Sequence, residues 1–148
     1  MSTARTPRPD ATPRTTRGEI VTRAESWLCP PVPFSTTRFH QNEHGIYRAD
    51  DTGYACMAWG LPGIPPDHRG GLDLTGLTTI SLPITVTDLL AGDLLVDTGA
   101  HVALFHEWAD ADRTACWVFA QLPGAGATHG LVPHHTHLDA RRHPRLTR

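Results

Sequence analysis

The chain has 148 residues, of which 39% are hydrophobic and 19% charged, and its formal net charge is -2. This length predicts a single domain. A near-neutral charge is atypical of nucleic-acid-binding proteins, which need a broad cationic surface. No apolar run approaches the roughly 20 residues that a membrane-spanning helix requires. We therefore expect no nucleic acid and no membrane among the partners of this protein.

The basic residues and the N-terminal segment give two further expectations. All 13 basic residues are arginine, and the chain also contains 13 glycines and 13 prolines. This composition indicates a GC-rich genome of the actinobacterial kind. The N-terminal segment has no continuous apolar stretch of the roughly 7 to 15 residues that a secretory signal contains. The sequence therefore predicts a cytoplasmic protein.

The first half of the chain is predicted to be mainly helix and loop. Residues 1–15 are rich in Pro, Thr and Arg and predict a disordered tail, followed by a single domain over residues 16–148. Thr16 and Glu19 have the spacing of a capping box, so a helix is expected from there to Pro30. Residues 31–49 predict a loop, and a second helix is expected to begin near Asp51.

The second half of the chain is predicted to be mainly strand. A helical turn is expected within Leu82–Leu90, after a loop rich in Pro and Gly. Short β-prone runs with turn residues between them then follow at Asp93–Asp97, His101–Trp108, Cys116–Leu122 and His129–His135. Helices followed by an antiparallel meander predict an α+β fold, with the N-terminal helices packed on an antiparallel sheet.

Three motifs occur in a fixed order along the chain. The first is YRADDTGY at residues 47–54, the second is LAGDLL at residues 90–95, and the third is HVALF at residues 101–105. Together they resemble the NlpC family of papain-like cysteine peptidases, best known for cleaving peptidoglycan stems. Members of that family show YR-x-D-C-S-G-[YF] at the start of a helix, L-x-P-G-D-L before a strand, and then a strand that opens with His. The resemblance implies a papain-like domain of the NlpC type.

The chain departs from this family at the nucleophile. Asp51 occupies the position of the family's catalytic cysteine, His101 matches the family's histidine, and Gln121 is the nearest match for the polar third residue. A carboxylate is a poor nucleophile for amide cleavage, because the acyl-enzyme would be a mixed anhydride. The sequence therefore argues against cysteine-peptidase activity.

Two interpretations of Asp51 remain open at this point. Asp is among the best N-cap residues, so Asp51 could be no more than a helix cap in an inactive site. Alternatively, the carboxylate stands beside His101 and favours the imidazolium form, which gives an acid–base pair without a nucleophile. In this second interpretation His101 carries the proton and Asp51 orients and charges it.

The three cysteines and the ten histidines suggest other sites that we consider weaker. Cys56 lies five residues beyond Asp51, which turns it by about 140° to a different side of the helix, so a buried thiol is favoured over a displaced nucleophile. Cys29 and Cys116 receive the same interpretation. The histidines match no recognised zinc spacing, and we expect neither a metal nor another cofactor.

Candidate substrate-binding residues lie before the second helix, where the family's substrate-binding segment is found. They are Phe34, Ser35, His40, His44, Tyr47 and Arg48. Solvated loop residues are an equally good interpretation of the two histidines.

The leading functional hypothesis is a non-peptidase enzyme that uses acid–base chemistry on a small organic substrate in an actinobacterial biosynthetic pathway. Cyclisation, dehydration or addition would suit Asp51, His101 and Gln121. Two alternatives are a catalytically inactive NlpC-like binding module and a residual amide or ester hydrolase that uses Cys56. The sequence does not indicate an oligomeric state.

Overall fold

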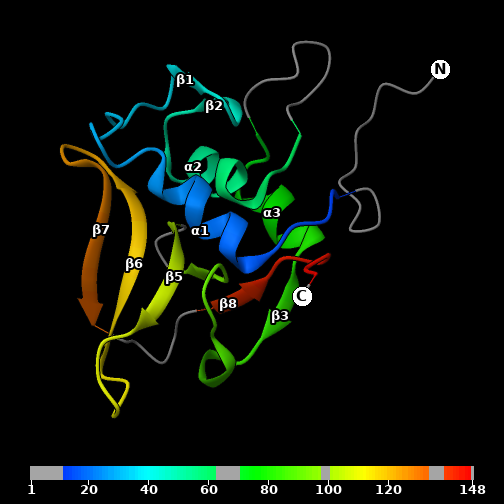
Figure 1. The fold of residues 1–148 in the computed structure, drawn as a ribbon, viewed down its shortest axis with the longest axis vertical. Coiled ribbons are helices and arrows are strands. Elements are labelled where there is room, and N and C mark those ends of the chain that lie inside the picture. Colours follow the sequence, from blue (N-terminus) through cyan, green and yellow to red (C-terminus); the bar gives the residue numbers. More distant parts are fainter. Residues whose placement is uncertain (1–11, 63–70, 98–100, 134–138, 148) are drawn as a thin grey trace.

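The fold is α+β, with helices packed against an antiparallel sheet (Figure 1). The computed structural model describes residues 12–62, 71–97, 101–133 and 139–147. The helices in this part of the chain are α1 (Arg17–Glu25), α2 (Asp51–Trp59), α3 (Leu74–Ile80) and a 3-10 turn, η2 (Val86–Asp88). The strands are β1 (Phe39–Asn42), β2 (Gly45–Arg48), β3 (Leu82–Ile84), β4 (Leu94–Val96), β5 (Val102–Trp108), β6 (Ala115–Leu122), β7 (Gly126–Pro133) and β8 (Asp139–Arg142).

The strands form one six-stranded sheet and one separate hairpin. The large sheet has the order β3-β8-β4-β5-β6-β7, and all of its described pairings are antiparallel. Strands β5, β6 and β7 form the meander that the sequence predicts, and β8 returns from the C-terminal region to lie between β3 and β4. The β1–β2 hairpin pairs only within itself, next to α2.

Helix α2 is the centre of the main hydrophobic core. All eight residues from Thr52 to Trp59 are buried, because α1 packs on one side of the helix and β5 and β6 on another. A helix that is apolar on every side can be stable only where neighbours cover it completely. Its C-terminus closes at Gly60, whose left-handed backbone (φ 71°) suits glycine.

A second, smaller core covers the other face of the sheet. Leu95, Phe105 and Val118 belong to it, and the segment that contains η2 contributes Leu89 and Val86. The sheet is therefore packed on both faces, which explains why the predicted strands contain more apolar residues than simple alternation would require.

Several expectations from the sequence are confirmed and others are wrong. The Thr16–Glu19 capping box starts α1, and α2 begins at Asp51. The segment over residues 31–49, expected to be a loop, contains the β1–β2 hairpin, whose short polar strands lack a clear alternation. Helix α3 is also absent from the expectations, because LTGLTTI is rich in β-branched residues that disfavour helix.

The ordered domain begins before residue 16. Thr12 and Thr15 are buried, and the backbone N–H of Thr15 donates to the carbonyl of Arg145 at 3.2 Å. The last part of the expected tail thus pairs with the C-terminal segment. Residues 1–11 of that tail lie outside the described residues.

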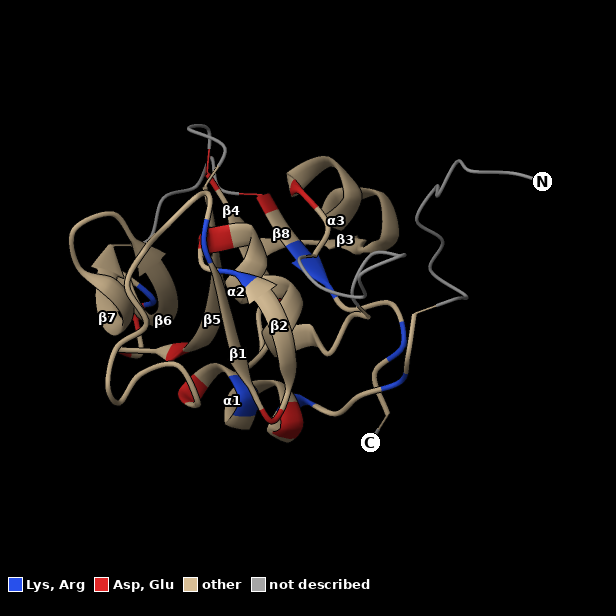
Figure 2. Cartoon of the chain, turned by 90° about the horizontal axis from the view of Figure 1, so that it is seen from above, with Lys and Arg blue, Asp and Glu red and all other residues tan. Residues whose placement is uncertain are grey.

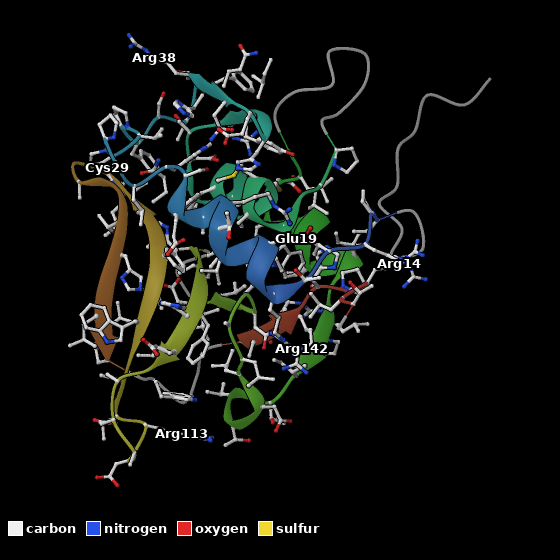
Figure 3. All side chains as sticks on the ribbon, in the orientation of Figure 1. Arg14, Glu19, Cys29, Arg38, Arg113 and Arg142 are labelled. Atoms are coloured by element: carbon white, nitrogen blue, oxygen red, sulfur yellow. The ribbon has the colours of Figure 1, made fainter. Side chains whose placement is uncertain are left out.

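A buried carboxylate ties the N-terminal helix to the sheet. Asp93 is fully buried and accepts hydrogen bonds from Arg17 on α1 (3.0 Å), from Arg142 on β8 (3.0 and 2.9 Å) and from the backbone N–H of Leu90 (2.9 Å). Arg142 is labelled on β8 in Figure 3. Because two guanidinium groups meet one buried carboxylate, removal of that charge leaves both cations poorly compensated.

We expect Asp93→Asn to lower the free energy of unfolding by about 3–5 kcal/mol, the usual cost of breaking a buried ion pair. Urea unfolding followed by circular dichroism measures this change. Asp112→Asn, in the exposed β5–β6 turn, is the matched control and should change stability by no more than about 0.5 kcal/mol. Equal effects of the two substitutions would contradict the role of Asp93.

Buried His143 makes the stability of the fold depend on pH. Its Nε2 faces the carbonyl of Trp59 at 3.2 Å, and its Nδ1 accepts from the backbone N–H of Arg145 at 3.0 Å. Burial lowers the pKa of His143 from 6.5 to about 4, outweighing the hydrogen bond to Trp59, and the nearby charge of Arg23 lowers it further. The imidazole of His143 is therefore neutral in the folded state.

The stability that His143 contributes should be complete above about pH 6.5 and lost as the pH falls through 4, because the unfolded state binds the proton first. The expected loss across this window is about 3 kcal/mol. His143→Gln should remove this component from a series of urea titrations, while His44→Gln, in the β1–β2 turn, should retain it. An unchanged pH dependence in His143→Gln would contradict the assignment.

Candidate functional site

Asp50, one residue before Asp51, caps helix α2. Its Oδ1 accepts a hydrogen bond from the backbone N–H of Gly53 at 2.8 Å, and its Oδ2 accepts one from Arg48 at 2.7 Å. Arg48 also donates to the hydroxyl of Thr52 at 2.9 Å. Asp51 is the first residue of the helix, so the interpretation of Asp51 as the N-cap is wrong. Two adjacent aspartates left that choice open in the sequence.

Gly53 lets the start of α2 lie directly against the end of β2. A Cβ atom at this position would be 1.8 Å from the carbonyl oxygen of Arg48, a distance that no side chain tolerates. The glycine of the YRADDTGY motif is thus required by close backbone packing. This packing fixes where the helix starts and consequently where the Asp51 carboxylate lies.

The structure brings Asp51 and His101 together. The Oδ2 atom of Asp51 is 3.7 Å from Nδ1 of His101 and accepts a hydrogen bond from the backbone N–H of Val102 at 3.0 Å. The Asp51 side chain is 15% exposed and the His101 side chain is 69% exposed. The carboxylate is therefore held by the protein, while most of the imidazole is open to solvent.

Backbone contacts explain why these two residues meet. His101 immediately precedes β5, the strand against which α2 packs, and Val102 is the first residue of that strand. The bond from Val102 to Asp51 joins the helix start to the strand start. His101 is also held by its own N–H, which donates to Asp97 at 3.1 Å.

Gln121 is buried, and its amide group contacts a residue outside the Asp51–His101 pair. Its Nε2 donates to the carbonyl of Val32 at 3.1 Å, and its Oε1 is buried without a hydrogen-bond partner among the described residues. Extending the β5–β6 register by two residues from Leu104↔Phe119 places Gln121 across from Val102. Gln121 therefore lies one residue from His101 across the strands, with its amide directed to Val32.

A pocket lies next to the N-terminus of α2. Its volume is about 310 Å³, and it is lined by Val32, Pro33, Phe34, Ser35, Arg38, Phe39, His40 and Ala49. Ala49 is two residues before Asp51 in the chain, and the carbonyl of Val32 accepts the hydrogen bond from Gln121. Arg38 is exposed and extends outward from the start of the hairpin (Figure 3).

The candidate substrate-binding residues divide into two groups. Phe34, Ser35 and His40 line the pocket, and the ring of His40 packs edge-on against buried Trp27. The other three do not line it. His44 lies in the hairpin turn beside Glu43, Tyr47 is buried with its hydroxyl bonded to the carbonyl of Leu61, and Arg48 belongs to the α2 cap.

The sequence did not suggest five of the pocket residues. Val32, Pro33, Phe39 and Ala49 are apolar or nearly so, and Arg38 alone of the unexpected residues carries charge. Only the hairpin, which folds residues 32–38 back over Ala49, brings them together. The β1–β2 turn at Glu43–His44 is the sequence signal from which the hairpin, and with it the pocket, could have been predicted.

The cysteines supply no nucleophile to the site. Cys56 is fully buried, its thiol donates to the carbonyl of Leu72 at 3.4 Å, and burial raises its pKa to about 12. Cys116 is also buried, as expected. Cys29 is exposed near the end of α1, so the expectation that it is buried is wrong (Figure 3).

The distribution of charged and metal-ligating side chains bears on the kind of site that the chain can form. Acidic and basic positions are scattered over the ribbon (Figure 2). In the described part of the chain no three His, Cys, Asp or Glu side chains cluster as a metal centre would need. His134, His135 and His137 lie outside the described residues.

Over the described residues, no helix has the length and apolar character needed to cross a membrane.

Comparisons with known proteins give no relative for this chain. No protein-family model, no curated protein and no solved structure matches it.

We expect Asp50→Ala to lower the free energy of unfolding by about 1–2 kcal/mol, because it removes the cap of α2. Asp51→Asn keeps an oxygen that can accept from Val102 and should cost less than about 1 kcal/mol, mainly the lost charge at the helix N-terminus. Thermal and urea unfolding measure both variants. A larger loss in Asp51→Asn than in Asp50→Ala would contradict the assignment of the cap.

Proposed function

We propose that this protein is a non-peptidase enzyme in which Asp51 and His101 form an acid–base pair. The substrate is a small organic molecule, and the reaction is of the cyclisation, dehydration or addition type. The observation that carries the proposal is the 3.7 Å approach of a fixed carboxylate to an exposed imidazole beside a pocket. The biosynthetic, actinobacterial setting is part of the same proposal and rests on the arginine-only composition.

The geometry allows Asp51 and His101 to have different roles in the reaction. Asp51 is held by Val102 and lies beside Nδ1 of His101, so it favours the tautomer with a proton on Nδ1. The opposite nitrogen, Nε2, is then free to take a proton from a substrate and to return it. A contraction of less than 1 Å would turn the 3.7 Å contact into a hydrogen bond, and such tightening on substrate binding is usual.

The positions of the two residues also support the proposed NlpC-type fold. Asp51 opens a buried helix and His101 immediately precedes a neighbouring antiparallel strand, as the resemblance implies for the cysteine and histidine of that family. Gln121 is on the next strand, near the position expected for the third residue, and we propose that it supports the site through Val32. We propose Gln121 as a positioning residue.

The pocket supports a substrate with an apolar part. Val32, Pro33, Phe34, Phe39 and Ala49 give it mainly apolar walls, and Ser35 and His40 add polar groups. A volume of about 310 Å³ is at the lower end of small-molecule sites. Phe34, Ser35 and His40 are therefore the substrate-binding residues that we retain, while His44, Tyr47 and Arg48 are not required by this proposal.

A binding module without catalysis is the second candidate. It is favoured by the pocket itself, which is formed without any contribution from the side chains of Asp51 or His101. The hydrolase that uses Cys56 has less support, because a buried thiol with a pKa of about 12 forms almost no thiolate at neutral pH.

Turnover by wild-type protein and by His101→Ala tests the proposal. The protein is incubated with a pool of small metabolites, and depletion is followed by mass spectrometry without selecting compounds in advance. We expect at least one compound to be converted, and His101→Ala or Asp51→Asn to slow its conversion by about 10²- to 10⁴-fold, the usual contribution of a general acid–base group.

His44→Ala and iodoacetamide treatment are the matched controls. His44 lies outside the pocket and the pair, so its loss should leave turnover unchanged. Alkylation of exposed Cys29 should also have no effect. Ligand binding that survives in all variants without any conversion would support the binding module, and inactivation by iodoacetamide with Cys29→Ser present would support the hydrolase. Either result would overturn the acid–base proposal.

A further inference from the structure

Two histidines from different strands meet on the sheet, away from the Asp51–His101 pair. Nδ1 of His106 on β5 is 2.8 Å from Nε2 of His129 on β7, across the intervening strand β6. They reach each other because His129 is paired with Phe119 on β6, and both imidazoles pack on the Phe119 ring. A β-bulge between Phe105 and Glu107 alters the course of β5 where His106 lies.

The His106–His129 pair contacts aromatic rings on one side and is open to solvent on the other. Trp117 stacks on His129 with a centroid separation of 5.3 Å and an interplanar angle of 19°. His129 is exposed and His106 is half-buried, so both rings can be reached from solvent.

We propose that His106 and His129 form a binding site for a divalent transition-metal ion that prefers imidazole nitrogen and square-planar geometry, Cu(II) first and Ni(II) next. The inference is independent of the proposed catalytic function. Sequence spacing gave no indication of this site, because 23 residues separate the two histidines and only the β5–β6–β7 order joins them.

The distance between the two nitrogens favours this geometry. With metal–nitrogen bonds of about 2.0 Å, two ligands at 90° are separated by about 2.8 Å, whereas two ligands at the tetrahedral angle are separated by about 3.3 Å. The observed separation is 2.8 Å. A square-planar ion therefore needs each ring to turn its lone pair towards the ion, but does not need the strands to move apart as a tetrahedral ion would.

The protonation of the His106 and His129 rings is also compatible with the binding of a metal ion. Without metal, the donor ring carries its single proton on the inner nitrogen that it shares with its partner, and the acceptor ring carries its proton on its outer nitrogen. Metal binding moves the donor ring's proton, through solvent, from its inner to its outer nitrogen. With metal, both inner nitrogens coordinate, and each ring carries its proton on the outer nitrogen. Water would complete the coordination.

Cu(II) titration of metal-free protein tests this proposal by calorimetry and by tryptophan fluorescence. The background is the full chain with His134, His135 and His137 changed to Gln, which removes three other imidazoles. We expect one Cu(II) per chain, and we expect His106→Gln or His129→Gln to weaken its binding by at least about tenfold, since loss of outer-shell partners alone often costs that much. His44→Gln should leave the affinity unchanged.

Trp117 provides a second readout that a different binding place would not give. Cu(II) bound between the histidines should quench Trp117, so Trp117→Phe should lose most of the quenching while the calorimetric affinity stays within about threefold. Thermal unfolding without metal checks that each variant is folded. Cu(II) affinity that is unchanged in both histidine variants, or that is lost in His101→Gln instead, would overturn the proposal.

Discussion

The complete burial of helix α2 is the constraint on which the rest of this structure depends. Because every residue from Thr52 to Trp59 is covered, the helix can neither rotate nor slide without opening the core. Its N-terminus is fixed in addition by the Asp50 cap and by the close approach of Gly53 to Arg48. The Asp51 carboxylate therefore has a defined position, and the bond to Val102 transmits that position to the start of β5.

The site combines a mostly buried, hydrogen-bonded member with an exposed one. Asp51 is mostly buried and bonded, whereas the His101 ring is largely exposed and is held mainly through its backbone. An acid–base pair benefits from this arrangement, because the carboxylate orients the imidazole without itself contacting the substrate. The pocket is lined by Ala49, two residues before Asp51, and its other walls come from the segment that leads into the hairpin and from the hairpin's first strand.

The parts that sequence predicted well are those with local signals. The capping box of α1, the start of α2 and the β5–β6–β7 meander each follow from residue spacing within a few positions. The return of β8 into the sheet depends on contacts between distant segments, which no local pattern encodes. The hairpin over residues 39–48 is a local structure, but its short polar strands lack the alternation that would predict it. The same reason explains the site: Asp51 and His101 were suggested by resemblance, but the Asp50 cap and the pocket of Val32 and Phe39 required three-dimensional information.

The central claim is that Asp51 and His101 act as one unit. A double-mutant cycle on the turnover of a converted compound tests it most directly, with Asp51→Asn, His101→Gln and the double variant measured under one set of conditions. If the pair acts as a unit, the double variant should be no slower than the slower single variant, within about twofold. Rate losses that multiply in the double variant would show that the two residues act independently and would contradict this account.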